Sequence, residues 1–275
     1  MNIQNPSKEE EDELESSKAP LLEHLVELRT RIVYSLWAFL VAFLFCFWQS
    51  QNIYAFLTQP LANAEANRGT GDHHMIYTAL YEAFFTQVKV GMWGALCLAF
   101  PFMAYQLWLF IAPGLYKHER KAFWPFLIAT PIMFMLGGAF VYYLMLPRAI
   151  QFFISYESSG ENGSIPIELQ AKVGEYLDFV TTLIFAFGFC FELPVLLILL
   201  GRVGIVTSEG LASVRRYAIV GVVALAAVVT PPDVFSQLSL AIPLVGLYEL
   251  SIWGVWLVEK ARAKAEAAEA ADTKK

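Results

Sequence analysis

Acidic side chains that stand alone beside apolar runs are the residues of this sequence best suited to chemistry. Glu119 is one: it lies within Lys117-His118-Glu119-Arg120-Lys121, after an aromatic and apolar stretch that ends at Tyr116. Pro113-Gly114 favours a break in regular structure inside that stretch. One interpretation is an interfacial anchor, with aromatic rings at headgroup depth and bases held on one side of a membrane. The alternative is that the lone carboxylate docks a cation.

A second acid, Glu192, lies inside an apolar run, in the sequence Phe191-Glu192-Leu193-Pro194. A carboxylate at such a position is costly and seldom faces lipid. Pro194 removes a helix hydrogen bond and frees a backbone carbonyl near residue 190. Together these residues predict a kinked helix with a polar niche. Two roles fit this acid equally well. It can make an internal hydrogen bond that locks the fold, or it can be a site for a partner's polar group or for a proton.

Neither acid belongs to a recognisable catalytic arrangement. The sequence has no His-Glu-x-x-His, no glycine-rich phosphate loop and no Gly-x-Ser-x-Gly. His73 and His74 follow Asp72 but lack a spacing that fixes metal geometry. The three cysteines each lie within an apolar run, which fits buried hydrophobic positions rather than disulfides or metal ligands. We therefore expect no enzyme activity, no cofactor and no metal site.

The composition predicts which elements position the acids. Of the 275 residues, 57% are hydrophobic and only 16% are charged, and the mean hydropathy is +0.51. Such long, charge-poor runs predict an all-α polytopic membrane protein. Six runs are long enough in outline to be spans, at about residues 32–48, 90–109, 122–146, 179–200, 217–229 and 237–258. The membrane domain covers 20–258, between an acidic, disordered tail at 1–19 and a second tail at 259–275.

The distribution of Lys and Arg predicts the orientation. Fifteen of the 19 lie before the first span, between spans two and three, between four and five, or after six. The opposite side holds only Arg68, Arg148 and Lys172. Because positive side chains are retained in the cytoplasm, both termini and the segment with Glu119 are predicted to be cytoplasmic. No basic patch alternates with aromatic residues, so we expect no nucleic-acid partner.

The last two spans are short. Residues 217–229 would form a helix of roughly 20 Å, against a hydrocarbon core of ~30 Å. If Glu249 marks the inner interface, the sixth span is equally short. Thr230-Pro-Pro-Asp233 joins the two, its prolines end one helix, and Asp233 or Ser236 can cap the next. A short pair has to thin the bilayer or recruit a partner.

Four motifs, in order, resemble the signatures of the TatC family. They are His24-Leu-Val-Glu-Leu-Arg-Thr-Arg31, Phe110-Ile-Ala-Pro-Gly-Leu-Tyr-Lys-His-Glu-Arg120, Phe191-Glu-Leu-Pro194 and Thr230-Pro-Pro-Asp-Val-Phe-Ser-Gln237. The similarity covers roughly 20–258. It implies a six-helix, cupped bundle that receives the signal peptides of folded cargo in the twin-arginine translocase. It also implies a bacterial inner membrane, single-span TatA and TatB partners in a multimeric complex, and transport driven by the proton-motive force.

The resemblance also implies roles for particular residues. Glu27 and Glu119 match the acids that recognise the signal peptide, and Phe110 matches an aromatic residue of the same site. Glu192 matches an acid on the concave face, and Thr230 and Gln237 match positions where a partner helix docks. Two residues match structural positions in loops: Pro60 in the first outer loop, and Asp233 in the loop between spans five and six.

The chemistry of arginine fits two separate acids. A guanidinium is a planar fork that suits a carboxylate, and adjacent side chains of an extended peptide diverge. Two acids on separate elements, Glu27 and Glu119, therefore match an arginine pair better than one acid does. Two other functions stay consistent with the residues: a proton-coupled small-solute transporter that uses Glu192, and a passive scaffold for membrane assembly.

Overall fold

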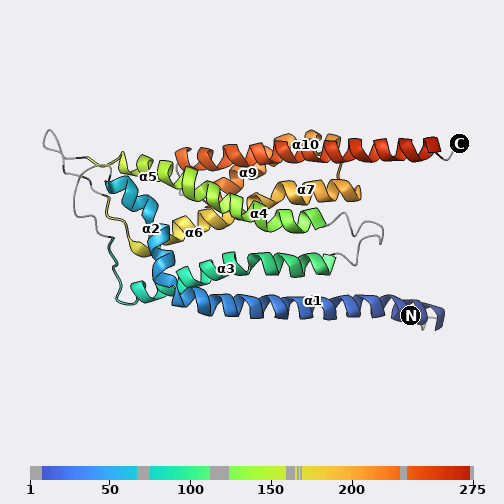
Figure 1. Cartoon of the computed structure of the whole chain (residues 1–275), viewed down its shortest axis with the longest axis horizontal. Helices are drawn as coiled ribbons and strands as arrows, with labels where there is room; N and C mark the ends of the chain where they lie inside the picture. The colour runs from blue at the N-terminus through green and yellow to red at the C-terminus, as the bar shows by residue number, and fades with distance from the viewer. Residues whose placement is uncertain are drawn as a thin grey trace, which may run out of the picture.

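The chain folds as a bundle of long helices (Figure 1). The computed structural model describes residues 8–66, 75–111, 124–158, 165, 167, 169–229 and 234–272. In this part of the chain the helices are α1 (Lys8–Trp48), α2 (Ser50–Ala66), α3 (Glu82–Ile111), α4 (Trp124–Phe140), a π-helical turn (Val141–Met145), α5 (Leu146–Ile154), α6 (Val173–Cys190), α7 (Glu192–Val203), α8 (Ser208–Ser213), α9 (Arg215–Val229) and α10 (Val234–Asp272). Pairing between extended segments is limited to isolated bridges there.

Five helical segments of the described chain are long and apolar enough to cross a membrane. They are His24–Trp48, Glu82–Phe110, Pro125–Ile154, Val173–Val203 and Gln237–Lys264. The predicted class, an all-α polytopic membrane protein, is confirmed. The predicted fifth span corresponds to α9, whose 15 residues make a helix of roughly 22 Å.

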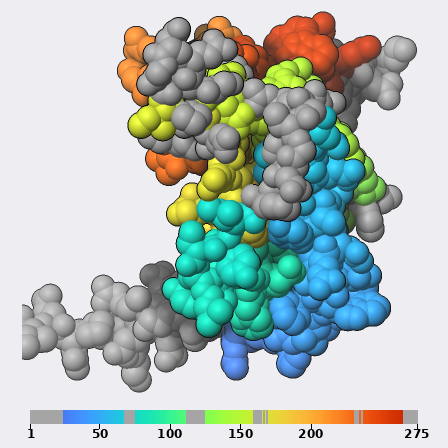
Figure 2. Space-filling model, turned by 90° about the vertical axis from the view of Figure 1, so that its left-hand side faces the viewer, coloured from blue at the N-terminus to red at the C-terminus, as the bar shows by residue number. Residues whose placement is uncertain are grey.

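The helices run between two ends of the bundle. α1 begins and α10 ends at one end, which we call the N-terminal end (Figure 1). We call the opposite end the α2 end, because α2 crosses it. Figure 2 shows the α2 end face-on, with the start of α3 below, α2 rising on the right and the α9–α10 pair above. A chain that starts and finishes at the same end makes an even number of passes through the bundle.

Two helices extend further than the sequence pattern predicts. α1 begins at Lys8, within the segment expected to be disordered. Glu, Leu and Lys are good helix formers, and the helix of the first span continues back through them. α10 runs without a break through Glu249 to Asp272. The helix therefore does not end at Glu249, and its apolar segment, Gln237–Lys264, is long enough to span a membrane. Glu249 pairs with Arg215 of α9: Nε of Arg215 lies 2.6 Å from Oε1 of Glu249.

Two prolines at the α2 end, Pro60 and Pro147, stand inside helical segments. Pro60 lies within α2 and is buried, which corrects its expected place in a structural loop. Pro147 begins the first turn of α5, directly after the π-helical turn Val141–Met145. A proline fits a first turn because it has no N–H to donate. The helix that starts with α4 therefore continues to Ile154, beyond the predicted boundary near Leu146.

The carbonyl that Pro60 leaves without a helical donor is satisfied by another helix. Pro60 has no N–H for the carbonyl of Phe56, one turn earlier. The hydroxyl of Tyr142, in the π-helical turn, donates to that oxygen at 2.7 Å. The two aromatic rings stack with centroids 4.2 Å apart. Tyr176 of α6 donates to the next carbonyl, that of Leu57, at 3.0 Å. These bonds attach α2 to the bundle.

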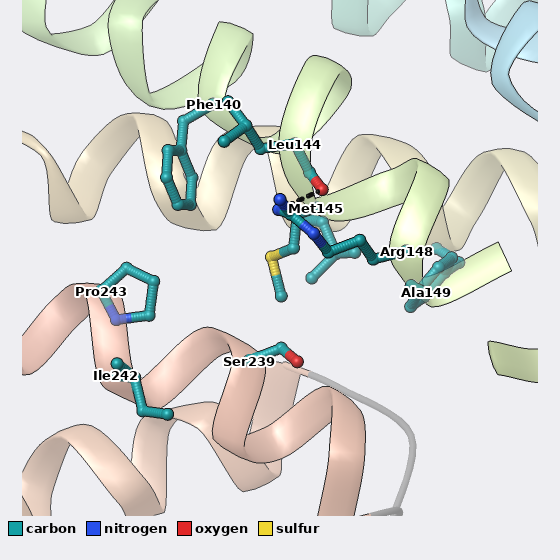
Figure 3. A pocket seen from close by; sticks show the side chains of 10 residues that line it. Phe140, Leu144, Met145, Arg148, Ala149, Ser239, Ile242 and Pro243 are labelled. Carbon is teal, nitrogen blue, oxygen red and sulfur yellow. Dashed lines mark hydrogen bonds between the residues drawn. The ribbon is translucent and has the colours of Figure 1, made fainter. Parts of the chain in front are cut away.

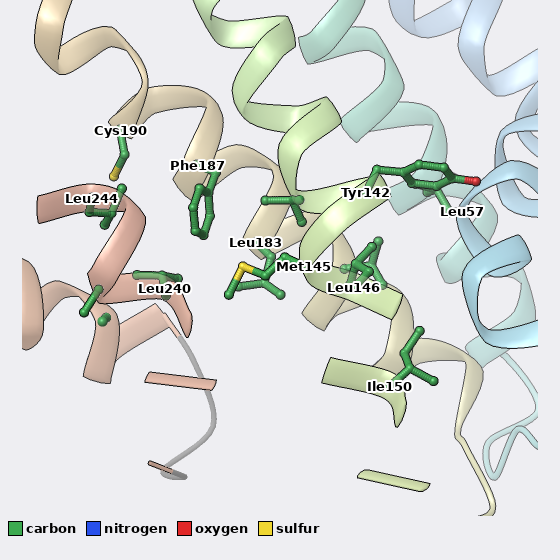
Figure 4. Packing of buried hydrophobic residues seen from close by; sticks show 14 of the residues in the cluster. Leu57, Tyr142, Met145, Leu146, Ile150, Leu183, Phe187, Cys190, Leu240 and Leu244 are labelled. Carbon is green, nitrogen blue, oxygen red and sulfur yellow. The ribbon is translucent and has the colours of Figure 1, made fainter. Parts of the chain in front are cut away.

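The main core lies where α2, α5, α6 and α10 meet (Figure 4). Leu146, Leu183, Phe187 and Leu244 are almost completely buried in it. Elsewhere, glycine allows close packing: a Cβ on Gly201 of α7 would lie 2.7 Å from a methyl of Val255 on α10. Small residues at helix interfaces let backbones approach closely in membranes. This packing holds α7, and with it Glu192, against α10.

Candidate functional site

A polar cluster lies towards the N-terminal end, where α1 packs along α3. Glu27 and Arg31 are one helical turn apart on α1, a spacing that brings side chains together. Nη2 of Arg31 lies 3.2 Å from Oε1 of Glu27. Nη1 of Arg31 donates to Oε1 of Gln106 on α3 at 3.3 Å. Gln106 is buried, and the Glu27 and Arg31 side chains are 31% and 27% exposed.

An aromatic pair lies beside this cluster. The ring of His24 on α1 stacks on that of Phe110 on α3, with centroids 4.2 Å apart and planes 16° apart. His24 is exposed, whereas Phe110 is partly covered. The stack fixes one predicted site residue, Phe110, within one helical turn of Gln106. The two long-range contacts, Arg31–Gln106 and His24–Phe110, thus join the same faces of α1 and α3.

This arrangement can bind and exchange a guanidinium. The Glu27 carboxylate already accepts from one guanidinium, that of Arg31. Nε of Arg31 is buried and has no hydrogen-bond partner within the described part of the chain. Partly exposed ion pairs contribute little stability, with a median of ~0–1 kcal/mol. An external cation can therefore compete with Arg31 for Glu27 at small cost.

The sequence pattern singled out Glu27 and Phe110, but it missed Gln106, as well as Thr130 of α4, which lies beside Glu192. It gave His24 no role of its own. The signal for Gln106 was available, because it is an amide within an apolar run. Glu119, the other predicted peptide-binding acid, belongs to the segment between α3 and α4 and lies outside the described residues.

Glu192 occupies a break between two helices in the middle of the bundle. α6 ends at Cys190, and Glu192 stands in the first turn of α7, two residues before Pro194. Its side chain is 7% exposed. It lies beside Thr130 and the backbone of Phe134, both on α4. The predicted interruption with a buried acid is therefore present.

The carboxylate of Glu192 is only partly satisfied. Its Oε1 is buried and has no hydrogen-bond partner among the residues that the structure describes. No cation in that part of the chain pairs with it within 4 Å. Phe134, whose backbone lies beside Glu192, packs its ring edge-to-face against Phe185 and Phe189 of α6. An acid in these surroundings can accept a polar group that a partner brings.

The α9–α10 pair contains one of the predicted partner-docking residues. Nε2 of Gln237 donates to the carbonyl of Val223 on α9 at 3.3 Å, so part of its bonding capacity is used within the chain. Thr230 and Asp233 lie outside the described residues, as do His73 and His74. In the part that is described, no three His, Cys, Asp or Glu side chains are grouped to hold a metal ion.

Together these features describe an integral membrane protein of long helices, with a guanidinium-holding acid towards one end and a buried, half-satisfied acid between its spans. The family model described as "Sec-independent protein translocase protein (TatC)" matches residues 23–243. The chain belongs to the TatC family. It is a component of a Sec-independent protein translocase, a protein transport system, and is not an enzyme.

Similar proteins cover nearly the whole chain. The Sec-independent protein translocase protein TatC of Magnetococcus marinus is 47% identical over 254 residues, which are 92% of this chain and 90% of that protein. The TatC protein of Rickettsia prowazekii is 42% identical, covering 84% of this chain and 90% of its own. A crystal structure of a twin-arginine translocase receptor, TatC, superposes with a TM-score of 0.73 at 35% identity, covering 86% of this chain and 99% of the other.

Proposed function

We propose that this chain is the receptor that binds the twin-arginine signal peptides of folded cargo. Glu27, Glu119 and Phe110 form the binding site, which faces the cytoplasm. The chain crosses a bacterial inner membrane six times with both termini inside, and export draws on the proton-motive force. The similarity of the fold to that of a solved twin-arginine translocase receptor supports this function.

The contact between Glu27 and Arg31 carries the proposal. It is a carboxylate that already accepts from a guanidinium, 3.2 Å away, at a partly exposed position. An arginine of a signal peptide can take the place of Arg31 without any new kind of contact. The His24–Phe110 stack beside it supplies an aromatic surface on which a guanidinium or an apolar side chain can rest.

A second acid is needed because the two arginines of the peptide diverge from an extended backbone. Glu119 follows α3 by eight residues, and α3 carries Gln106 and Phe110 next to Glu27. The two acids therefore come from separate elements, as a diverging pair requires. Bases accompany both acids, Arg29 on α1 with Glu27 and others beside Glu119 in the sequence; they repel cations elsewhere and make the acids selective docking points.

The proposed topology rests on the helices and the charges together. Five segments are long enough to span, and α9 supplies a sixth, short crossing. α1 begins and α10 ends at the same end of the bundle (Figure 1), which an even number of crossings requires. Fifteen of the 19 Lys and Arg residues lie in segments assigned to that side, which makes it the cytoplasmic one.

The short α9 is the proposed docking place for TatA- and TatB-like single-span proteins in a multimeric complex. A helix of roughly 22 Å thins the bilayer beside it or recruits a partner. Gln237 donates through Nε2 to Val223, and its carbonyl oxygen is the group proposed to accept from a partner. Glu192, with its unsatisfied Oε1, receives a polar group of a partner helix during transport.

Peptide affinity, measured in detergent at fixed salt, tests the receptor function. Glu119→Ala should weaken an Arg-Arg peptide at least tenfold, about 1.4 kcal/mol, because a charge-assisted pair is lost. A Lys-Lys peptide should bind the unchanged protein less well, since a point charge cannot form the planar fork. Glu209→Gln, an exposed acid on α8, is the control and should leave affinity unchanged.

Two outcomes would contradict the site. If Glu119→Gln binds as tightly as the unchanged protein, Glu119 is an interfacial anchor and not a receptor residue. If Glu27→Ala and Glu119→Ala combine additively in a double-mutant cycle, the two acids do not serve one motif.

A further inference from the structure

An apolar pocket of about 230 Å³ opens between α5 and α10 towards the α2 end. Its walls come from three helical segments that are distant in sequence (Figure 3). Phe140, Leu144 and Arg148 lie on one side, Ser239 and Pro243 on the other, and Leu183 of α6 contributes as well. Figure 3 shows Arg148 and Ser239 on opposite walls.

Arg148 brings a positive charge to this pocket. Its Nη1 donates to the carbonyl of Leu144, one turn earlier, at 3.0 Å. Within the described residues no carboxylate lies within 4 Å of it, whereas Lys89 and Lys172, the other cations described at this end, are paired with Asp178 and Glu175. The remaining donors of a guanidinium are strong and directional, so among the described residues the pocket has a cation without a paired anion.

The pocket lies at the edge of the apolar layer. Phe179 lines it and follows Asp178, whose carboxylate pairs with Lys89 at 2.8 Å with both side chains about half exposed. An ion pair this exposed, between two spanning helices, is expected at the depth of the headgroups and not within the hydrocarbon. On the rim, Leu144 and Ile242 are 43% and 68% exposed, so the pocket opens sideways, towards lipid.

We propose that this pocket binds an anionic phospholipid of the adjacent leaflet. The phosphate accepts from the guanidinium of Arg148 and from the hydroxyl of Ser239, and one acyl chain lies along Phe140, Leu183 and Pro243. Ligand pockets with apolar walls and a few placed polar groups have this chemistry, and a guanidinium binds phosphate oxygens through charge-assisted hydrogen bonds. The lipid joins α5 to α10 across the gap between them.

The size of the pocket favours a lipid over a partner helix. An α-helix with its side chains is about 10–12 Å wide, so it could cover a pocket of about 230 Å³ but not enter it. An acyl chain is narrow and flexible enough to follow the walls. A helix lying across the opening would meet the charge of Arg148 with a carboxylate at most, and would leave the interior of the pocket unfilled.

Native mass spectrometry of the purified, delipidated protein with added phosphatidylglycerol or phosphatidylcholine tests the proposal. Phosphatidylglycerol should bind more tightly than phosphatidylcholine. Arg148→Gln keeps a donor for the carbonyl of Leu144 but removes the charge, and should lower the affinity for phosphatidylglycerol about fivefold, which is about 1 kcal/mol. Arg148→Lys should retain most of the affinity. Lys172→Gln, on the same end but already paired, should change nothing.

A second measurement identifies the occupant in native membranes. A photo-crosslinker at the exposed Ile242 should give adducts with lipid. Crosslinks to a polypeptide instead, equal binding of the two lipids, or equal affinity of Arg148→Gln and Lys172→Gln would each overturn the proposal. Binding of an Arg-Arg peptide should be unaffected in Arg148→Gln, because the peptide site lies at the other end of the bundle.

Discussion

The hydrogen bond between Tyr142 and the backbone of α2 provides a sharp test of how the α2 end is held. Tyr142→Phe removes only the hydroxyl that donates to the carbonyl of Phe56 at 2.7 Å. The ring, and its stacking 4.2 Å from that of Phe56, is kept. Because Pro60 has no N–H, the helix itself cannot supply another donor for this carbonyl. The variant therefore leaves a backbone acceptor unsatisfied.

The expected loss follows from the burial of the groups involved. Tyr142 is 9% exposed and Pro60 is buried. Leaving a buried acceptor unsatisfied costs about 1–3 kcal/mol, so the free energy of unfolding should fall by that amount. It can be measured by SDS titration of the protein in mixed micelles. Tyr143→Phe removes the same hydroxyl from the neighbouring residue, which is 68% exposed, and should change it by less than about 0.5 kcal/mol.

Pro60→Ala completes the test, because alanine restores the N–H that can donate to Phe56. In that background Tyr142→Phe should cost much less, and the double-mutant cycle should give a coupling of about 0.5–3 kcal/mol. If Tyr142→Phe is as stable as Tyr143→Phe, the carbonyl does not depend on the tyrosine. If the loss is the same with and without Pro60, the link between the proline and the hydroxyl is refuted.

Three further predictions concern the transport function. Glu192→Ala should leave the protein folded but impair translocation more than peptide binding, with Glu192→Gln milder because it keeps hydrogen bonding; full transport by the alanine variant would contradict the proposed role. A cysteine that replaces Ile165, which is 85% exposed at the α2 end, should react with an impermeant thiol reagent from outside. A cysteine that replaces Lys264 should not, and the reverse pattern would overturn the orientation. Crosslinkers at Thr230 and Gln237 should capture a TatB-like helix. A buried interhelical hydrogen bond of about 0.6–2 kcal/mol is enough to set the register of that helix. No adduct at either position would count against docking there.

Composition and local chemistry were enough to predict the class of protein and the position of the buried acid. Apolar runs of this length have no place in a soluble domain, so the helical membrane class could be predicted from composition. Pro194 predicted the interruption near Glu192, because a proline cannot donate within a helix, and the structure has α6 ending at Cys190. Neither prediction depends on a distant residue, which is why the chain alone could make both.

Which distant groups meet could be learned only from the packing of the helices. Gln106 lies 75 residues from Arg31 and accepts from it, and Thr130 of α4 lies beside Glu192. The sequence pattern placed Pro60 in a loop, but Tyr142, 86 residues away from Phe56, satisfies the carbonyl that a helical proline leaves free. The same holds for Glu249, an acid between apolar stretches of α10, which is paired with Arg215 across two helices. In each case a polar group that is unfavourable by local rules is stabilised by a partner that only packing brings within reach.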